Sequence, residues 1–231
     1  MKILAIDTSS KMLSIALGDG KDIIKEENYL LDRRHSSLLI PKIKEMLEGS
    51  SLSINKIDAF VVGLGPGSFT GLRIGVSAVK GLGLALKKPC IGIASIDALA
   101  MNTMGNFVSC PNGQLTKLPM VVPIIDAKRE NVYSAIYEKK NGRIIRKTDY
   151  LLIKVDKLLK KVKKDAIFLG DGVSIYKDKI GRGIFLQEKY WYPKAGNLIK
   201  LALPKIKRTK KCDLARLEPI YLYPKDCQVK K

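Results

Sequence analysis

Residues 65–75 read Gly-Pro-Gly-Ser-Phe-Thr-Gly-Leu-Arg-Ile-Gly, a glycine turn that links two kinds of regular structure. The apolar run before it, residues 59–64, is short and rich in β-branched and aromatic side chains, so it predicts a buried strand. A helix is predicted to begin near Ser68. Gly67, Gly71 and Gly75 recur at every fourth residue, so one face of this helix has almost no side chains and another backbone can approach it closely.

Three interpretations of this bare helix face are open. Backbone N–H groups at a helix start can hold a phosphate, but residues 65–75 lack the Gly-Lys-Ser/Thr ending of a Walker A loop and the Gly-x-Gly-x-x-Gly spacing of a dinucleotide loop. Alternatively, the glycines let the helix pack tightly on its own sheet. The third interpretation, which we favour, is that the face packs on another subunit, because each helical glycine forgoes about 1 kcal/mol of propensity.

The length and composition are those of a folded protein. At 231 residues the chain can bury a full core and form one domain or two small lobes. It has no run of about 18 apolar residues, and its N-terminus enters a strand pattern directly, so we expect a cytoplasmic protein without a membrane contact. Cys90, Cys110, Cys212 and Cys227 form no Cys-x-x-Cys pair, which favours reduced thiols.

His35 is the single histidine of the chain. This excludes every site that needs two imidazoles, and we expect no metal site. A site built from carboxylates alone stays open, although no Asp-x-Asp cluster occurs. A Cys-His nucleophile pair also stays open, but a lone histidine beside Ser36 and Ser37 at a helix start is more often a surface or packing residue.

The net charge of +20 lies mainly in the second half of the chain. Residues 1–110 carry 13 Lys and Arg against 10 acids, whereas residues 111–231 carry 29 against 12. Residues 154–164 combine lysines with apolar side chains and predict an amphipathic helix with a cationic outer face. Nucleic acid or an acidic partner would suit this face, and a solvated lysine face is the alternative. The candidate tRNA contacts are Lys157, Lys160, Lys161 and Lys164.

Both halves of the chain show the same order of elements. In the first half, strands are predicted at residues 2–7, 12–17 and 23–29, a helix at 34–47 and a strand at 59–64. In the second half, strands are predicted at 120–126, 132–137 and 143–153, then the lysine-rich helix and a strand at 166–170. This repeat predicts an α/β protein of the actin, sugar kinase and Hsp70 class, with one lobe at residues 1–104 and a reduced second lobe at 105–231.

Each predicted lobe has an acid at the end of its first strand, Asp7 or Asp126. In the actin-like class the turns at these strand ends bind ATP phosphates. Thr8 and Ser9 supply hydroxyl groups at the first turn, so a small-molecule kinase or ATPase is one candidate function. The alternative is that both acids cap neighbouring backbone amides in ordinary turns.

The chain resembles the TsaB (YeaZ) family over nearly its full length. The resemblance rests on the opening Ile-Leu-Ala-Ile-Asp-Thr-Ser, on residues 65–75, on Asp-Ala-Lys-Arg-Glu-Asn-Val-Tyr at 126–133 and on Glu-Pro-Ile-Tyr-Leu at 218–222. It implies an actin-like fold with a degenerate cleft and a non-catalytic role beside the paralogue TsaD, which makes threonylcarbamoyladenosine at position 37 of tRNAs. The metal-binding His-x-x-x-His of TsaD has no counterpart at residues 95–101.

The resemblance also implies a set of partners. ATP and the metal are expected on TsaD, so this chain has no cofactor of its own. A TsaE-type ATPase and tRNA join the complex, and the isolated chain is a homodimer.

In this family the helices of the first lobe form both the homodimer and the TsaD interface. The resemblance therefore implies that the following residues lie at that surface: Ser68, Thr70, Gly71, Ile74, Gly75 and Ala78, with His35, Leu38 and Leu39 on the adjoining helix. The chain departs from the family at Tyr221-Leu222-Tyr223, where the family has Tyr-Leu-Arg. Three functions stay open, namely a non-catalytic subunit, a small-molecule kinase or ATPase, and a general RNA-binding module.

Overall fold

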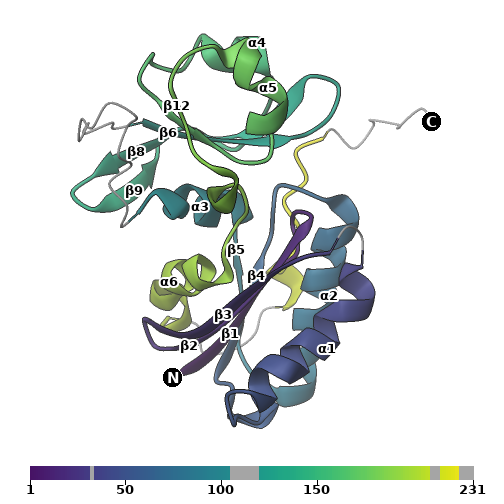
Figure 1. Cartoon of the computed structure of the whole chain (residues 1–231). Helices are drawn as coiled ribbons and strands as arrows, with labels where there is room; N and C mark the ends of the chain where they lie inside the picture. The colour runs from purple at the N-terminus through teal and green to yellow at the C-terminus, as the bar shows by residue number, and fades with distance from the viewer. Residues whose placement is uncertain (32–33, 105–119, 209–213, 224–231) are drawn as a thin grey trace. The chain divides into compact units, whose positions relative to one another are not determined.

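The computed structural model describes residues 1–31, 34–104, 120–208 and 214–223, and it divides the chain into two compact units (Figure 1). The first unit contains Met1–Ala98 and Pro193–Ile220. The second unit begins at Leu99, runs to Tyr192, and resumes at Tyr221. The predicted boundary, which assigned all of residues 105–231 to the second lobe, is therefore wrong for residues 193–220, because this segment returns to pack on the first unit.

The first unit is built on a five-stranded sheet in the order β3-β2-β1-β4-β5. Its strands are β1 (Lys2–Asp7), β2 (Met12–Asp19), β3 (Asp22–Leu30), β4 (Ala59–Gly63) and β5 (Cys90–Ile93). The first three are antiparallel, and β4 and β5 continue the sheet in parallel with β1. All predicted strands of this half are confirmed to within two residues.

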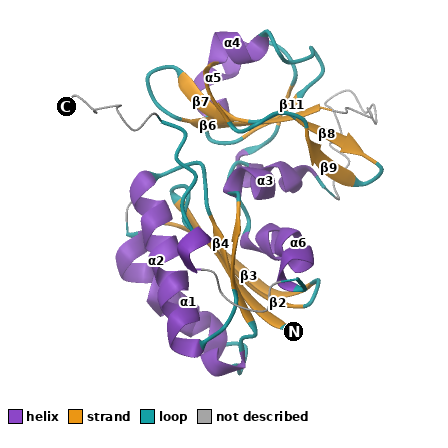
Figure 2. Cartoon of the chain, turned by 180° about the vertical axis from the view of Figure 1, so that it is seen from behind, coloured by secondary structure: helices purple, strands orange, loops and turns teal. Residues whose placement is uncertain are grey.

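Helices cover both faces of this sheet, and Figure 2 shows α1 and α2 on one side and α6 on the other. Helices α1 (His35–Glu48) and α2 (Phe69–Leu86) pack on the face that carries Leu4 and Ile6. Helix α6 (Ala195–Ile206) packs on the face that carries Ile3 and Ala5. Strand β1 is therefore apolar without alternation, because both of its faces are buried.

Helix α6 was not predicted from the sequence. Its apolar residues Leu198, Ile199, Ala202 and Ile206 follow helical spacing and are buried. Pro204 lies in the last turn on the exposed side, so the helix loses only one backbone hydrogen bond near its end.

The second unit repeats the first with shorter elements. Its main sheet has the order β10-β7-β6-β11-β12, with β8 paired to β6 and β9. Its strands are β6 (Met120–Asp126), β7 (Asn131–Ser134), β8 (Tyr137–Lys140), β9 (Arg143–Arg146), β10 (Leu151–Lys154), β11 (Ile167–Leu169) and β12 (Ile184–Phe185). Its longer helix is α5 (Val173–Ile180), and α4 (Val155–Leu159) has only five residues. Helix α3 (Ser95–Ala100) lies at the boundary of the two units.

Two strands predicted in the second half are each divided into two. Residues 131–140 form β7 and β8, both of which pair with β6, and residues 143–154 form β9 and β10. The pairing along β6 is interrupted near Pro123, which has no N–H to donate to the ladder. Neither break is marked by glycine or proline, so the sequence did not reveal them.

The lysine-rich helix is also shorter than predicted, because α4 ends at Leu159 and Lys160 to Lys164 lie in the turns that follow. A helix through residues 154–164 would place Lys157 above Lys161 and Lys160 above Lys164. Like charges at this spacing destabilise a helix. The buried side chains of Leu158 and Val162 still hold this segment on the second unit.

Candidate functional site

The glycine turn positions the start of α2 and the end of β4. Gly65 has a φ of +91°, a backbone conformation that favours glycine, and its N–H donates to the hydroxyl of Ser95. Ser68 caps α2, since its hydroxyl accepts a hydrogen bond from the N–H of Gly71 at 3.2 Å. The strand, the turn and the helix therefore lie as the sequence predicts.

The bare face of α2 is covered by the chain itself. A Cβ atom at Gly71 would lie 2.1 Å from the carbonyl oxygen of Thr8, and one at Gly75 would lie 2.3 Å from the Thr8 hydroxyl. A Cβ atom at Gly67 would lie 2.2 Å from the carbonyl oxygen of Ser9. The favoured interpretation that these glycines contact another subunit is therefore wrong, and their packing on the turn after β1 explains them.

The turn after β1, residues 7–9, is buried by this contact. Thr8 donates its hydroxyl hydrogen to the Gly71 carbonyl at 2.7 Å and is fully buried. Asp7 Oδ1 accepts hydrogen bonds from the N–H and the hydroxyl of Ser9, at 2.9 and 2.6 Å. Asp7, Thr8 and Ser9 are thus engaged with each other and with α2, and none of them is exposed to hold a nucleotide phosphate.

Asp7 has an unusual environment for a carboxylate. Its Oδ2 makes no hydrogen bond of good geometry among the described residues, although the Ser95 hydroxyl lies near it, and it is so close to Gly63 that a Cβ there would be 1.9 Å away. Burial raises the pKa of Asp7 above its ordinary value, and the interactions with Ser9 and Ser95 only partly oppose this. Because the folded protein holds this proton more tightly than the unfolded chain, the stability contributed by Asp7 falls as the pH rises through the raised pKa.

We expect Asp7→Asn to stabilise the protein at neutral pH. An amide removes the buried charge at nearly the same volume, and a buried unsatisfied polar group costs about 1–3 kcal/mol. The melting temperature at pH 7.5 should rise by about 2–10 °C. This gain should shrink as the pH falls below the raised pKa, and it should be smallest below the ordinary carboxyl pKa of about 3.9, where Asp7 is protonated in both states. Circular dichroism melts at several pH values measure the effect, and a lower melting temperature for the variant at pH 7.5 would contradict it.

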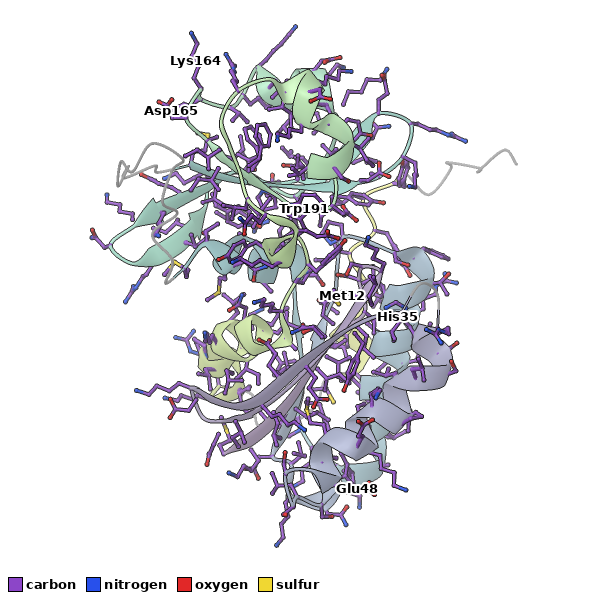
Figure 3. All side chains as sticks on the ribbon, viewed as in Figure 1. Met12, His35, Glu48, Lys164, Asp165 and Trp191 are labelled. Atoms are coloured by element: carbon purple, nitrogen blue, oxygen red, sulfur yellow. The ribbon has the colours of Figure 1, made fainter. Side chains whose placement is uncertain are left out.

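His35 begins α1 and lies beside the backbone of Met12 (Figure 3). Its side chain is buried, and Nε2 has no hydrogen-bond partner in the described parts of the chain. Burial lowers the pKa of His35, although hydrogen bonds to the backbone of Met12 and Ser10 oppose this. His35 and Leu39, which is also buried, therefore pack inside the first unit and do not belong to its surface.

The outer face of α2 is not covered by the described parts of the chain. We define it by Thr70, Ile74, Ser77, Ala78, Gly81 and Leu84, which are exposed or half-buried. A Cβ at Gly81 would meet nothing within 4 Å, and Leu84 is 70% exposed. Ile40 of the neighbouring α1 is also exposed, whereas Leu38 is half-buried. Of the predicted interface residues, this face keeps Thr70, Ile74 and Ala78, and Ser68 lies exposed at the helix start.

Ser77, Gly81 and Leu84 were missed by the sequence interpretation. Their signal was available, since Ser77 and Gly81 are one helical turn apart and lie opposite the apolar core positions Leu72, Val76 and Val79. Helix α2 is also long and apolar enough to cross a membrane by length and composition alone. Its buried residues pack in the core of the first unit, as the central helix of a water-soluble domain also does.

In the second unit, Asp126 caps the turn that follows β6. Its Oδ1 accepts from the Lys128 N–H at 3.0 Å and from the Tyr176 hydroxyl at 3.2 Å, and its Oδ2 pairs with Lys128 Nζ at 2.6 Å. Burial would raise the pKa of Asp126, but the hydrogen bonds and charge of Lys128 outweigh it and lower the pKa. Asp126 therefore caps a backbone amide in a turn, which is the alternative considered for it in the sequence analysis.

The predicted tRNA contacts are exposed but do not share one helix face. Lys157 lies in α4, and Lys160, Lys161 and Lys164 lie beyond its end. None of the four pairs with an acid in the part of the chain that the structure describes.

No group of three potential ligands that could hold a metal ion occurs among the described residues. Cys90 is buried, whereas Cys110, Cys212 and Cys227 lie outside the described ranges.

Comparisons with known proteins identify similar chains and folds. A family model described as TsaD, tRNA N6-adenosine threonylcarbamoyltransferase, matches residues 29–212. The tRNA threonylcarbamoyladenosine biosynthesis protein TsaB of Bacillus subtilis is 33% identical over 183 residues, which cover 78% of this chain and 75% of that protein. TsaB of Escherichia coli is 29% identical over 230 residues, which cover 96% and 94% of the two chains.

Among solved structures, YeaZ from Pseudomonas aeruginosa has a TM-score of 0.77 at 25% identity and covers 96% of this chain and 99% of that chain. Component A of (R)-2-hydroxyglutaryl-CoA dehydratase from Acidaminococcus fermentans has a TM-score of 0.50 at 12% identity, over 90% and 99% of the two chains, and shows a likeness of fold alone. The predicted actin-like α/β fold is confirmed.

Proposed function

This chain belongs to the TsaB (YeaZ) family, and we propose that it acts as the non-catalytic partner of a TsaD-type enzyme that forms threonylcarbamoyladenosine at adenosine 37 of tRNAs. The observation that carries the proposal is the match to TsaB over nearly the whole of both chains. This match is independent of any single site residue and agrees with the fold.

The buried turn after β1 supports a non-catalytic role. In an actin-like ATPase this turn must reach the nucleotide phosphates, whereas here Thr8 is enclosed by Gly71 and Gly75 of α2 and Ser9 by Gly67 just before it. The sequence also offers one histidine, and a pair of histidine metal ligands needs two. ATP and the metal are accordingly assigned to the TsaD-type partner, and the kinase or ATPase alternative has no accessible phosphate turn in the first unit to support it.

The outer face of α2 is the proposed docking surface for the TsaD-type partner. It combines small side chains with an exposed Leu84, so a partner helix could approach its backbone closely. In isolation the same face would pair with a second copy, which makes the homodimer and the complex mutually exclusive. A TsaE-type ATPase, tRNA bound through the complex, and a cytoplasmic location complete the proposal.

Depletion of the protein tests the proposed function directly. Threonylcarbamoyladenosine in total tRNA, measured by mass spectrometry of nucleosides, should fall to a small fraction of its normal level. Expression of the protein from a plasmid should restore the threonylcarbamoyladenosine level. Another tRNA modification, measured in the same digest, should stay constant throughout. An unchanged level of threonylcarbamoyladenosine after depletion would overturn the proposal.

A further inference from the structure

The turn between β6 and β7 has a backbone that ordinary side chains rarely adopt. Three consecutive residues other than glycine are left-handed, with φ values of +66° for Lys128, +52° for Arg129 and +61° for Glu130. Left-handed backbone is unfavourable for residues with a Cβ, and it usually occurs at single positions. A chain that needed only to reverse direction would place glycine or asparagine there, so this conformation needs another reason.

The left-handed turn is held by several hydrogen bonds and a ring contact. Within it, Ala127 N–H donates to the Asn131 carbonyl and Asn131 N–H donates to the Lys128 carbonyl, both at 3.0 Å. The hydroxyl of Tyr223 donates to the Ala127 carbonyl at 2.6 Å, and its ring packs edge-on against Tyr133. Tyr223, which stands where the family has arginine, thus braces the turn at its first residue.

Three acids around the left-handed turn lie in ion pairs with lysines. Asp126 binds Lys128, and Lys179 lies 3.5 Å from Glu130 and 3.1 Å from Asp156. The tip residue Arg129 is exposed and forms no ion pair within the described residues. The turn therefore presents to solvent a guanidinium that forms no ion pair with the described acids.

Further cations continue from this tip along α4. The N–H of Val155 at the start of α4 donates to the Glu130 carbonyl at 3.3 Å, which places the helix beside the turn. Lys154 is opposite Asn131 in the pairing of β10 with β7. Exposed Lys157 follows in α4, and Lys160 and Lys161 lie beyond its C-terminal end.

We infer that Arg129, held by the left-handed turn, and the lysines along α4 form a surface that binds the phosphodiester backbone of tRNA. Several exposed cations near the turn and on the segment that continues from it suit the repeated phosphates of a polynucleotide, and a guanidinium can bind a phosphate through two hydrogen bonds. This inference deepens the proposed function by naming a surface for the RNA, and it rests on that function for the choice of tRNA over other acidic partners.

The test uses the full chain and a fluorescently labelled tRNA transcript, with binding measured by anisotropy over a range of salt concentrations. Arg129→Ala should weaken binding about tenfold and should reduce the slope of log K against log salt by about 1. Lys56→Ala removes one exposed cation from the first unit and is the matched control, with an expected change below about twofold. Thermal melts show that each variant is folded.

A second variant separates positioning from charge. Tyr223→Phe keeps every charge but removes the hydroxyl that braces Ala127, so binding should weaken by about threefold with an unchanged salt slope. Equal tRNA affinities of Arg129→Ala and Lys56→Ala would overturn the inference. If Arg129→Ala kept normal tRNA affinity but no longer bound the TsaD-type partner, the inference would also be overturned. The turn would then be assigned to a protein contact. Neither result alters the depletion test, which alone decides the proposed function.

Discussion

Gly71→Ala is expected to destabilise the first unit by about 3 kcal/mol or more, enough to lower the melting temperature by about 10 °C. The added Cβ would lie 2.1 Å from the carbonyl oxygen of Thr8, which is a backbone atom in a buried turn. Relief would require α2 to move away from β1, and this movement would open the core around Val76 and Val79. The better helix propensity of alanine offsets only about 1 kcal/mol of this cost.

The matched control for Gly71→Ala is Gly81→Ala in the same helix. Its Cβ would meet no atom within 4 Å, so this variant should melt at the wild-type temperature or a few degrees above it. Circular dichroism and chemical denaturation measure both variants. If Gly71→Ala were as stable as Gly81→Ala, the tight packing of α2 on the turn after β1 would not exist in solution.

The second large effect is expected for Gly81→Arg on the outer face of α2. Gly81 is exposed in the middle of a helix, where glycine costs about 1 kcal/mol relative to alanine and nothing in its own chain requires it. A long charged side chain would prevent a second helix from approaching there. We therefore expect self-association and binding to the TsaD-type partner to weaken at least about 100-fold, which corresponds to about 2.7 kcal/mol.

Sedimentation and calorimetry with the purified partner measure the effect of Gly81→Arg. Asn55→Arg adds the same side chain to an exposed position outside α2 and should leave both associations unchanged. The melting temperature of Gly81→Arg should stay close to that of the wild type, because arginine is a good helix former. If Gly81→Arg still dimerised and still bound the partner, the docking surface would have to lie outside α2.

The order of secondary structure was predictable because each element carries a local pattern. Residues 2–7 and 59–64 are short apolar runs, residues 35–48 have helical spacing, and both are signals that a short window contains. The Asn141-Gly142 turn was predictable for the same reason, and its two positive φ values match the hairpin that it forms. The breaks between β7 and β8 and between β9 and β10 were not, since they depend on which strands pair. Strands β7 and β8 pair with different parts of β6, whereas β10 pairs with β7 and β9 pairs with β8.

The candidate site was predicted only in part. Helix α2 was correctly identified, but Gly71 and Gly75 were assigned to the wrong contact, and His35 and Leu39 were expected at the surface although they are buried. The spacing of the glycines indicates that another part of a protein packs closely on the helix. It does not indicate whether that part belongs to the same chain or to a partner. The left-handed turn at residues 128–130 had no signal at all, because its three residues are ones that seldom adopt this backbone.

By itself, the sequence determined the repeated α/β architecture, the single histidine and the resemblance to TsaB, since these depend on residue identity and local spacing. Only the tertiary structure decided which atoms lie against the bare face of α2. Thr8 and Gly71 are 63 residues apart, and Ala195 returns to donate its N–H to Ser14 across 181 residues. Such contacts depend on how strands and helices pack across the sheet, and no local pattern of side chains encodes that packing. The structure shows that the glycines of α2 pack on their own chain, and the docking surface that we propose is the helix face left exposed.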